Sequence, residues 1–475
     1  MRAVERPARV AVTAGARKSQ PLSEANDESN QDAVRRCRTR VAHRVGRPVR
    51  RKRRPAAAVD NPAPCAASGH GRREGSPVSH AEPATRAVRA GIDRDAAHGA
   101  VVPPIVLSSN FSFEGFGKKR RYDYTRSGNP TRDLLGEALA ELEGGAGGVV
   151  TATGMAAITL VLSLLEPGQR LVVPHDAYGG SWRLFNALAR KGAFELLTID
   201  FSCSRQLAAA LDPAPAMVWI ETPSNPLLRI TDLRFVAGAA KRVGALVVVD
   251  NTFLSPALQT PIDHGADLVV HSTTKYINGH SDVVGGAVVA KTSELHERLT
   301  WWANALGLTG SPFDAFLTLR GLRTLDARLR VHEENTHALL DLLVDHEAVA
   351  AVHYPGLAAH PGHTLAARQQ KGFGAMLGFE LRGGEAAARA FCEGLDCFTL
   401  AESLGGVESL VAHPATMTHA AMSAEARAAA GIGDGLLRLS VGIEHVRDLR
   451  ADLAAGLARA LRVTGSLPVR EPVIA

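Results

Sequence analysis

Short runs of β-branched and other apolar residues alternate with helical patterns from about residue 131 onward, and this alternation limits the possible folds more than any other feature of the sequence. Strands separated by helices of about ten residues form β-α-β units, which pair their strands in parallel and bury both faces of the sheet. The pattern therefore predicts an α/β fold with a mostly parallel sheet. We expect helices at 133–143, 181–191, 235–242 and 326–343, and strands at 170–173, 216–220, 245–249, 268–271 and 375–381.

The character of the sequence changes along the chain and predicts four segments. The first is rich in Arg, Ala, Pro and Ser without a hydrophobic period, so we expect disorder there, for which a translation start downstream of Met1 is one hypothesis. The second contains Pro103-Pro104 and a Ser-, Phe- and Gly-rich stretch, which indicates an extended arm. We expect a disordered basic extension at 1–80, an arm at 81–130 that contributes to the active site of a partner subunit, a large α/β domain at 131–330 and a smaller α+β domain at 331–475.

Composition and charge exclude several classes of protein. Hydrophobic residues make up 45% and charged residues 21% of the chain, as in ordinary globular proteins, and no apolar run approaches the roughly 18 residues of a membrane span. The N-terminus lacks the apolar core of a secretory signal and the 5 cysteines are scattered without a CxxC pair, so we expect a cytoplasmic protein without disulfides or a metal site. Residues 1–75 hold 18 Lys and Arg against 7 Asp and Glu, so a polyanion-binding or regulatory protein that acts through this tail is an alternative of a different class.

Two charged residues stand at the ends of neighbouring predicted strands. Asp250 directly follows the strand at 245–249, and Lys275 comes shortly after the strand at 268–271. Because ligands of open α/β sheets bind outside the carboxyl ends of the strands, both side chains are expected in one crevice. There an amine can form a Schiff base and a carboxylate can keep a pyridine nitrogen protonated, which together suit a pyridine-aldehyde cofactor. For either residue alone, a helix-capping aspartate or a solvated lysine is the ordinary alternative.

Segments rich in hydroxyl groups and glycine near these residues indicate a phosphate site. Ser272 and Thr274 flank the lysine, and the segment 151–157 opens a helix after a strand, with Gly154 and Met155 at its start. The N–H groups of a helix N-terminus bind phosphate. Together with the amine and the carboxylate, this pattern predicts a phosphorylated cofactor.

The sequence from about residue 85 to 461 resembles the cysteine/methionine-metabolism family of fold-type-I pyridoxal-phosphate enzymes, whose signature is carried by Asp-Leu-Val-Val-His-Ser-Thr-Thr-Lys-Tyr-Ile-Asn-Gly-His-Ser-Asp at 267–282. The resemblance implies an aminotransferase-like fold and pyridoxal 5'-phosphate as cofactor. It implies that Lys275, Tyr178 and Asp250 are the catalytic residues, with Lys275 forming the Schiff base. The implied cofactor contacts are Asp250 at the ring nitrogen, Tyr178 stacked on the ring, Asn225 at the phenolic oxygen, Gly154, Met155, Ser272 and Thr274 at the phosphate, and Tyr124 and Arg126 at the phosphate in the partner subunit.

The same resemblance implies the substrate contacts and the assembly. In Leu-Leu-Arg-Leu-Ser-Val-Gly-Ile-Glu at 436–444, Arg438 matches the family's arginine for the α-carboxylate of an amino acid. Arg183 and Asp123 correspond to positions that shape the acylhomoserine and cysteine sites, and Glu402 and Ser403 are expected to line the same region. Because the arm serves a neighbouring site, the implied assembly is a homotetramer built from dimers with shared active sites.

Family members differ in the carbon at which they react. The segment Ala-Glu-Ser-Leu-Gly-Gly-Val-Glu-Ser-Leu at 401–410 resembles the γ-acting branch, and Tyr-Gly-Gly-Ser at 178–181 lacks the cysteine usual in methionine γ-lyases. The strings at 179–185, 320–325 and 367–376 are most similar to bacterial enzymes of methionine biosynthesis that replace the acyl group of O-succinyl- or O-acetylhomoserine by cysteine. Degradative γ-elimination by the same residues stays open as the alternative.

Overall fold

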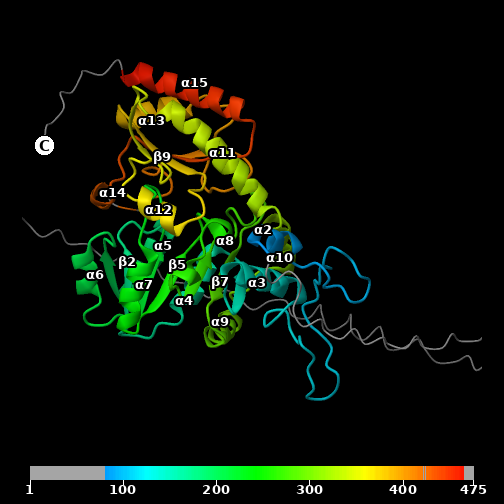
Figure 1. The fold of residues 1–475 in the computed structure, drawn as a ribbon. Helices are drawn as coiled ribbons and strands as arrows, with labels where there is room; N and C mark the ends of the chain where they lie inside the picture. Colours follow the sequence, from blue (N-terminus) through cyan, green and yellow to red (C-terminus); the bar gives the residue numbers. More distant parts are fainter. Residues whose placement is uncertain (1–80, 421, 423, 465–475) are drawn as a thin grey trace, which may run out of the picture. The chain divides into compact units, whose positions relative to one another are not determined.

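The computed structural model describes residues 81–420, 422 and 424–464 (Figure 1). The predicted disordered extension at 1–80 lies outside the described residues. The helices in the described part are α2 Pro83–Arg89, α3 Pro130–Glu143, α4 Gly154–Leu162, α5 Gly179–Arg190, α6 Ser204–Ala210, α7 Leu233–Arg242, α8 Ser255–Leu258, α9 Ser293–Leu306, α10 Pro312–Leu322, α11 Leu325–Leu343, α12 His363–Gln369, α13 Gly384–Cys392, α14 Ala424–Ala430 and α15 Val446–Thr464, together with the 3-10 helix η1 Pro261–His264.

A seven-stranded sheet forms the larger part of the described chain. Its strands lie in the order β1-β7-β6-β5-β4-β2-β3. All neighbours pair in parallel except β7, which runs antiparallel to both β1 and β6. The strands are β1 Gly147–Thr151, β2 Arg170–Pro174, β3 Glu195–Ile199, β4 Met217–Glu221, β5 Leu246–Asp250, β6 Leu268–His271 and β7 Gly286–Ala290.

Both faces of this sheet are buried, because successive strand residues enter two different apolar cores. On β5, Val247 and Val249 belong to a core that includes α3, α7 and α10, whereas Val248 belongs to a core that includes α4, α5 and α9. This arrangement is the one expected of a mostly parallel sheet with helices on both sides. The predicted α/β fold is confirmed.

A second, smaller sheet follows in the C-terminal half. It has five strands in the order β10-β11-β12-β9-β8, and only the short β10–β11 pair is parallel. Helices α11, α13 and α15 lie beside it, with α13 and α15 packed on one another (Figure 1). The domain boundary predicted at 330 falls inside α11. The strands are β8 Val349–His353, β9 Met376–Leu381, β10 Thr399–Leu400, β11 Leu410–Ala412 and β12 Leu436–Ser440.

Every helix and strand expected from the sequence is present, with ends displaced by at most three residues. The largest displacement is at α3, which begins at Pro130 instead of 133. Its N-cap is Asn129, whose side chain accepts hydrogen bonds from the backbone N–H groups of Thr131 and Arg132. Proline at the first helical position needs no N–H partner, so the helix starts one turn before its apolar pattern does.

The segment between α2 and α3 is extended and contains isolated β-bridges rather than helices or strands. It exposes several large apolar side chains, including Leu107, Phe113 and Phe116. In the described part of the chain no helix is both long and apolar enough to cross a membrane.

Candidate active site

A cavity of about 430 Å³ opens at the carboxyl ends of β4, β5 and β6. Its walls come from these strand ends, from the first turns of α4 and α5, and from the loop before β11 and strand β12. The residues predicted from the sequence that line it are Gly154, Met155, Tyr178, Arg183, Asn225, Asp250, Ser272, Thr274, Lys275, Glu402, Ser403 and Arg438. Nothing in the described ranges groups three or more His, Cys, Asp or Glu side chains in a way that could hold a metal ion.

Lys275 enters the cavity from the turn that follows β6. Its Nζ donates a hydrogen bond to Oγ of Ser403 at 2.7 Å. Burial, together with the Arg438 guanidinium, lowers the pKa of the Lys275 amine from its ordinary 10.5 to about 8, although the Glu402 carboxylate raises it. A buried amine with a pKa near neutrality can act as a nucleophile or a base at physiological pH.

Ser403, the partner of Lys275, has a left-handed backbone conformation. Its φ is 86°, a value that residues other than glycine rarely adopt. The same residue accepts a hydrogen bond at its carbonyl oxygen from Nη2 of Arg438, at 2.8 Å. Ser403 therefore contacts Lys275 through its side chain and Arg438 through its backbone carbonyl.

Asp250 is the last residue of β5 and lies half-buried at the cavity floor. Its Oδ1 accepts the backbone N–H of Thr252 at 3.1 Å, and the hydroxyl of Thr252 accepts the N–H of Ser272. Burial raises the pKa of the Asp250 carboxyl, whereas the hydrogen bonds from Thr252 and the nearby His271 lower it. A second carboxyl, Glu221, pairs in register with it at the end of β4.

Glu221 is a cavity residue that was not predicted from the sequence. Its Oε2 accepts the backbone N–H of Tyr178 at 2.8 Å. The sequence did contain a signal for this residue, because β4 ends in an acidic residue just as β5 does.

The start of α4 and the residues around Ser272 form a cradle for an anion. In the described part of the chain, no hydrogen-bond acceptor is found for the backbone N–H groups of Gly154 and Met155. A Cβ built on Gly154 would lie 2.8 Å from both Cβ and Oγ of Ser272, so only glycine leaves this space open. The hydroxyl of Thr274 behaves differently, because it donates to the carbonyl oxygen of Gly285 at 3.1 Å and accepts its N–H at 3.0 Å.

Arg438 is fully buried on β12 and faces the cavity. Its Nη1 donates to Oδ1 of Asn225 at 2.9 Å. Its Nε is buried without a hydrogen-bond partner in the described residues. Burial lowers the pKa of the guanidinium to about 10. A buried guanidinium with a donor to spare is suited to a carboxylate ligand.

Tyr178 sits at the N-cap of α5, with its ring over the first turn of the helix. A Cβ at Gly180 would lie 2.5 Å from this ring, so the glycine makes room for it. Burial raises the pKa of the Tyr178 phenol, and Glu402 raises it while Arg183 lowers it. An amine, a carboxylate, an aromatic ring and an anion cradle thus surround one cavity, and this donor set fits pyridoxal phosphate.

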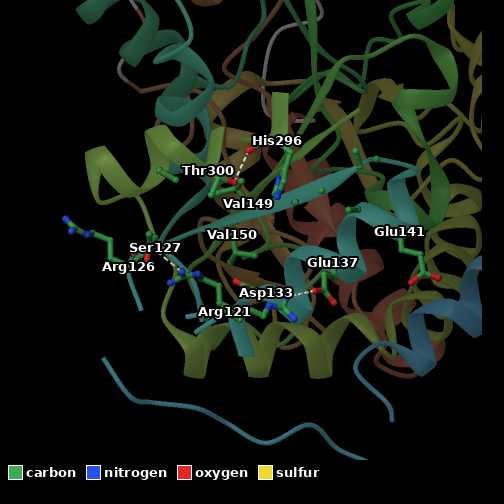
Figure 2. A pocket seen from close by; sticks show the side chains of 18 residues that line it. Arg121, Arg126, Ser127, Asp133, Glu137, Glu141, Val149, Val150, His296 and Thr300 are labelled. Carbon is green, nitrogen blue, oxygen red and sulfur yellow. Dashed lines mark hydrogen bonds and ion pairs between the residues drawn. The ribbon is translucent and has the colours of Figure 1, made fainter. Parts of the chain in front are cut away.

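Three predicted residues lie outside the cavity, all in the arm. Asp123 bonds to the hydroxyl of Ser127 at 2.7 Å, and the guanidinium of Arg126 lies 5.7 Å from the ring of Tyr124. Arg126 also borders a second cavity of about 540 Å³ beside α3 and β1, where its guanidinium points away from the other lining side chains (Figure 2). A single chain therefore does not bring these arm residues to Lys275.

Comparison with known proteins agrees with this site. The model of a family described as "Cys/Met metabolism PLP-dependent enzyme" matches residues 84–458. A cystathionine gamma-synthase of Escherichia coli (strain K12) is 56% identical over 378 residues, which cover 79% of this chain and 98% of the relative. A cystathionine gamma-lyase of Dictyostelium discoideum is 45% identical over 374 residues, covering 78% and 97%. The crystal structure of a cystathionine gamma synthase from Xanthomonas oryzae pv. oryzae in complex with cystathionine is 77% identical, with a TM-score of 0.80 over 80% of this chain and 99% of that one.

Proposed function

Because the chain belongs to the family of Cys/Met-metabolism PLP-dependent enzymes, we propose that it is a cystathionine γ-synthase, which replaces the acyl group of an O-acylhomoserine by cysteine to give cystathionine. The similarity to the Xanthomonas oryzae enzyme, 77% identical and solved with cystathionine, carries this proposal. The expected cofactor and enzyme class are confirmed by the family match.

The bound cofactor supplies an electron-withdrawing ring that makes the substrate's Cα–H acidic. The chain supplies the groups around that ring. Lys275 would hold the cofactor, and its amine would remove and return protons at the substrate carbons, which its pKa of about 8 permits near neutral pH. Asp250 would face the ring nitrogen, and Ser403 orients the lysine through the bond that Nζ donates to Oγ.

Two arginines would position the substrate. Arg438 binds the α-carboxylate, because its Nε lacks a partner and its Nη1 is already fixed by Asn225. Arg183 lies farther along α5 in the same cavity wall. A succinyl group brings a second carboxylate that Arg183 can bind, whereas an acetyl group brings none.

The assembly and the location are also part of the proposal. The arm is extended and exposes Tyr124 beside Arg126. We infer that this pair reaches the phosphate in the partner's cavity and that Asp123 reaches its substrate, within a cytoplasmic homotetramer built from dimers. An equimolar mixture of a Lys275→Ala chain and an Arg126→Ala chain tests the sharing, since mixed dimers would regain one intact site.

One assay distinguishes synthesis from breakdown. Purified holoenzyme is given O-succinylhomoserine with cysteine, and separately cystathionine, and the products are quantified. We expect faster cystathionine formation than cystathionine cleavage. Faster cleavage would favour γ-lyase activity, as in the Dictyostelium discoideum relative. Lys275→Ala provides the inactive control, and a chain lacking residues 1–80 tests the polyanion-binding alternative.

The role of Arg183 has its own test. Arg183→Gln should raise KM for O-succinylhomoserine and leave KM for O-acetylhomoserine nearly unchanged. Arg190→Gln, at the exposed end of the same helix, is the matched control. Equal effects of Arg183→Gln on both donors would contradict a succinate contact.

A further inference from the structure

The cavity floor holds two carboxyls on adjacent strands. Glu221 ends β4 and Asp250 ends β5, and the two residues are direct partners in the parallel ladder. Neighbouring strands lie about 4.8 Å apart, and paired residues project to the same face. Both side chains line the cavity, where Glu221 is buried and Asp250 is half-buried. Two carboxylates at this separation in a buried site repel each other, so one proton is favoured on the pair.

The two carboxyls make hydrogen bonds to different parts of the cavity wall. Asp250 is held by the N–H and hydroxyl of Thr252, which belong to its own turn, and it is attracted to His271. Glu221 reaches across to α5 and accepts the backbone N–H of Tyr178 at 2.8 Å. Tyr178 is the N-cap of α5 but makes no capping bond with its own side chain.

The charges around Glu221 also differ from those around Asp250. Two anionic groups face Glu221, Asp250 from β5 and Asp176 from the segment after β2. Asp176 is itself held by Arg229 at 3.1 Å and by the hydroxyl of Ser224 at 2.7 Å. Burial and these neighbours raise the pKa of Glu221 well above its ordinary value, although the N–H groups of Tyr178 and Asn225 lower it.

We propose that Glu221 is a positioning residue that is protonated at neutral pH, so that its oxygen holds the backbone of Tyr178 while Asp250 stays the single anion facing the heterocycle. The proposal rests on the proposed cofactor-dependent function. A carboxylic acid in this position accepts the Tyr178 N–H without placing a second negative charge beside Asp250. The ring of Tyr178 is thereby fixed over the cavity by a neutral group.

Infrared difference spectroscopy on the apoprotein tests the protonation state directly. The wild-type-minus-Glu221→Gln spectrum at neutral pH should contain the C=O stretch of a protonated carboxylic acid. The corresponding wild-type-minus-Asp250→Asn spectrum should lack it. A band that disappears in Asp250→Asn and persists in Glu221→Gln would place the proton on Asp250 and overturn the proposal. Glu385→Gln, at an exposed glutamate on α13 that pairs with Arg389, is the control.

Titration of the apoprotein with pyridoxal phosphate tests the positioning role. Glu221→Gln keeps a neutral acceptor for the Tyr178 N–H, so its Kd should stay within about twofold of wild type. Glu221→Ala leaves that N–H without an acceptor, and its Kd should rise by roughly tenfold. A loss in Glu221→Gln as large as in Glu221→Ala would show that the negative charge matters, and an unchanged Kd in both would remove the positioning role. Neither readout uses acylhomoserine or cysteine, so a failure of the proposed reaction would leave both results interpretable.

Discussion

The amine of Lys275 should titrate far below an ordinary lysine in the apoprotein. With a pKa of about 8, about 10% of the amine is neutral at pH 7, compared with roughly 0.03% at a pKa of 10.5. This difference is about 300-fold in the concentration of the reactive form. Competitive labelling with acetic anhydride between pH 6 and 11, followed by peptide mass spectrometry, measures the titration, and the peptide of the exposed Lys291 serves as the reference.

Glu402 offers a perturbation of known sign. Its carboxylate raises the Lys275 pKa, so Glu402→Gln should move the labelling midpoint below that of wild type. Glu385→Gln removes the same charge from an exposed site on α13 and should leave the midpoint unchanged. A Lys275 midpoint at 10 or above in the wild type, or an upward movement in Glu402→Gln, would refute the argument from burial and charge.

Two further substitutions test the anion cradle at Gly154 and the buried contact between Glu143 and His271. Gly154→Ala places a Cβ 2.8 Å from Ser272 in the cradle, so the apoprotein should bind pyridoxal phosphate at least about tenfold more weakly. Unaltered affinity would mean that no phosphate lies there. Glu143→Ala removes the acceptor of a 2.7 Å bond with buried His271 and of a bond from the Asn251 amide. The loss of an acceptor for two buried donors should lower the free energy of unfolding by about 2–6 kcal/mol, and an unchanged denaturant midpoint would argue against these bonds.

The elements that the sequence predicted well are those with a strong local pattern. The apolar run that became β6 has the predicted bounds, because every one of its residues is buried. The positions of Lys275 and Asp250 followed from strand ends, since the carboxyl ends of parallel strands share an edge. The antiparallel direction of β7 could not be predicted, because a buried strand has the same apolar run in either orientation.

The interactions that the sequence could not predict join residues far apart along the chain. Glu143 and His271 meet only because α3 packs against β1 and β7, the latter beside β6, and both residues are fully buried. Neither a spacing rule nor a motif connects residues so distant. Ser403 was expected to line the region of the substrate contacts, but its left-handed backbone and the bond that its carbonyl oxygen accepts from Arg438 have no signature in the sequence.

The left-handed backbone of Ser403 lowers the stability of the folded protein, whereas its hydroxyl supports catalysis. A serine at a φ of 86° costs on the order of 1–3 kcal/mol, whereas glycine tolerates the same geometry. Ser403→Gly should therefore give a sturdier protein that has lost the hydroxyl beside the lysine. Selection for heat resistance alone would enrich this glycine, and the resulting variants would have higher thermal stability but a lower turnover rate.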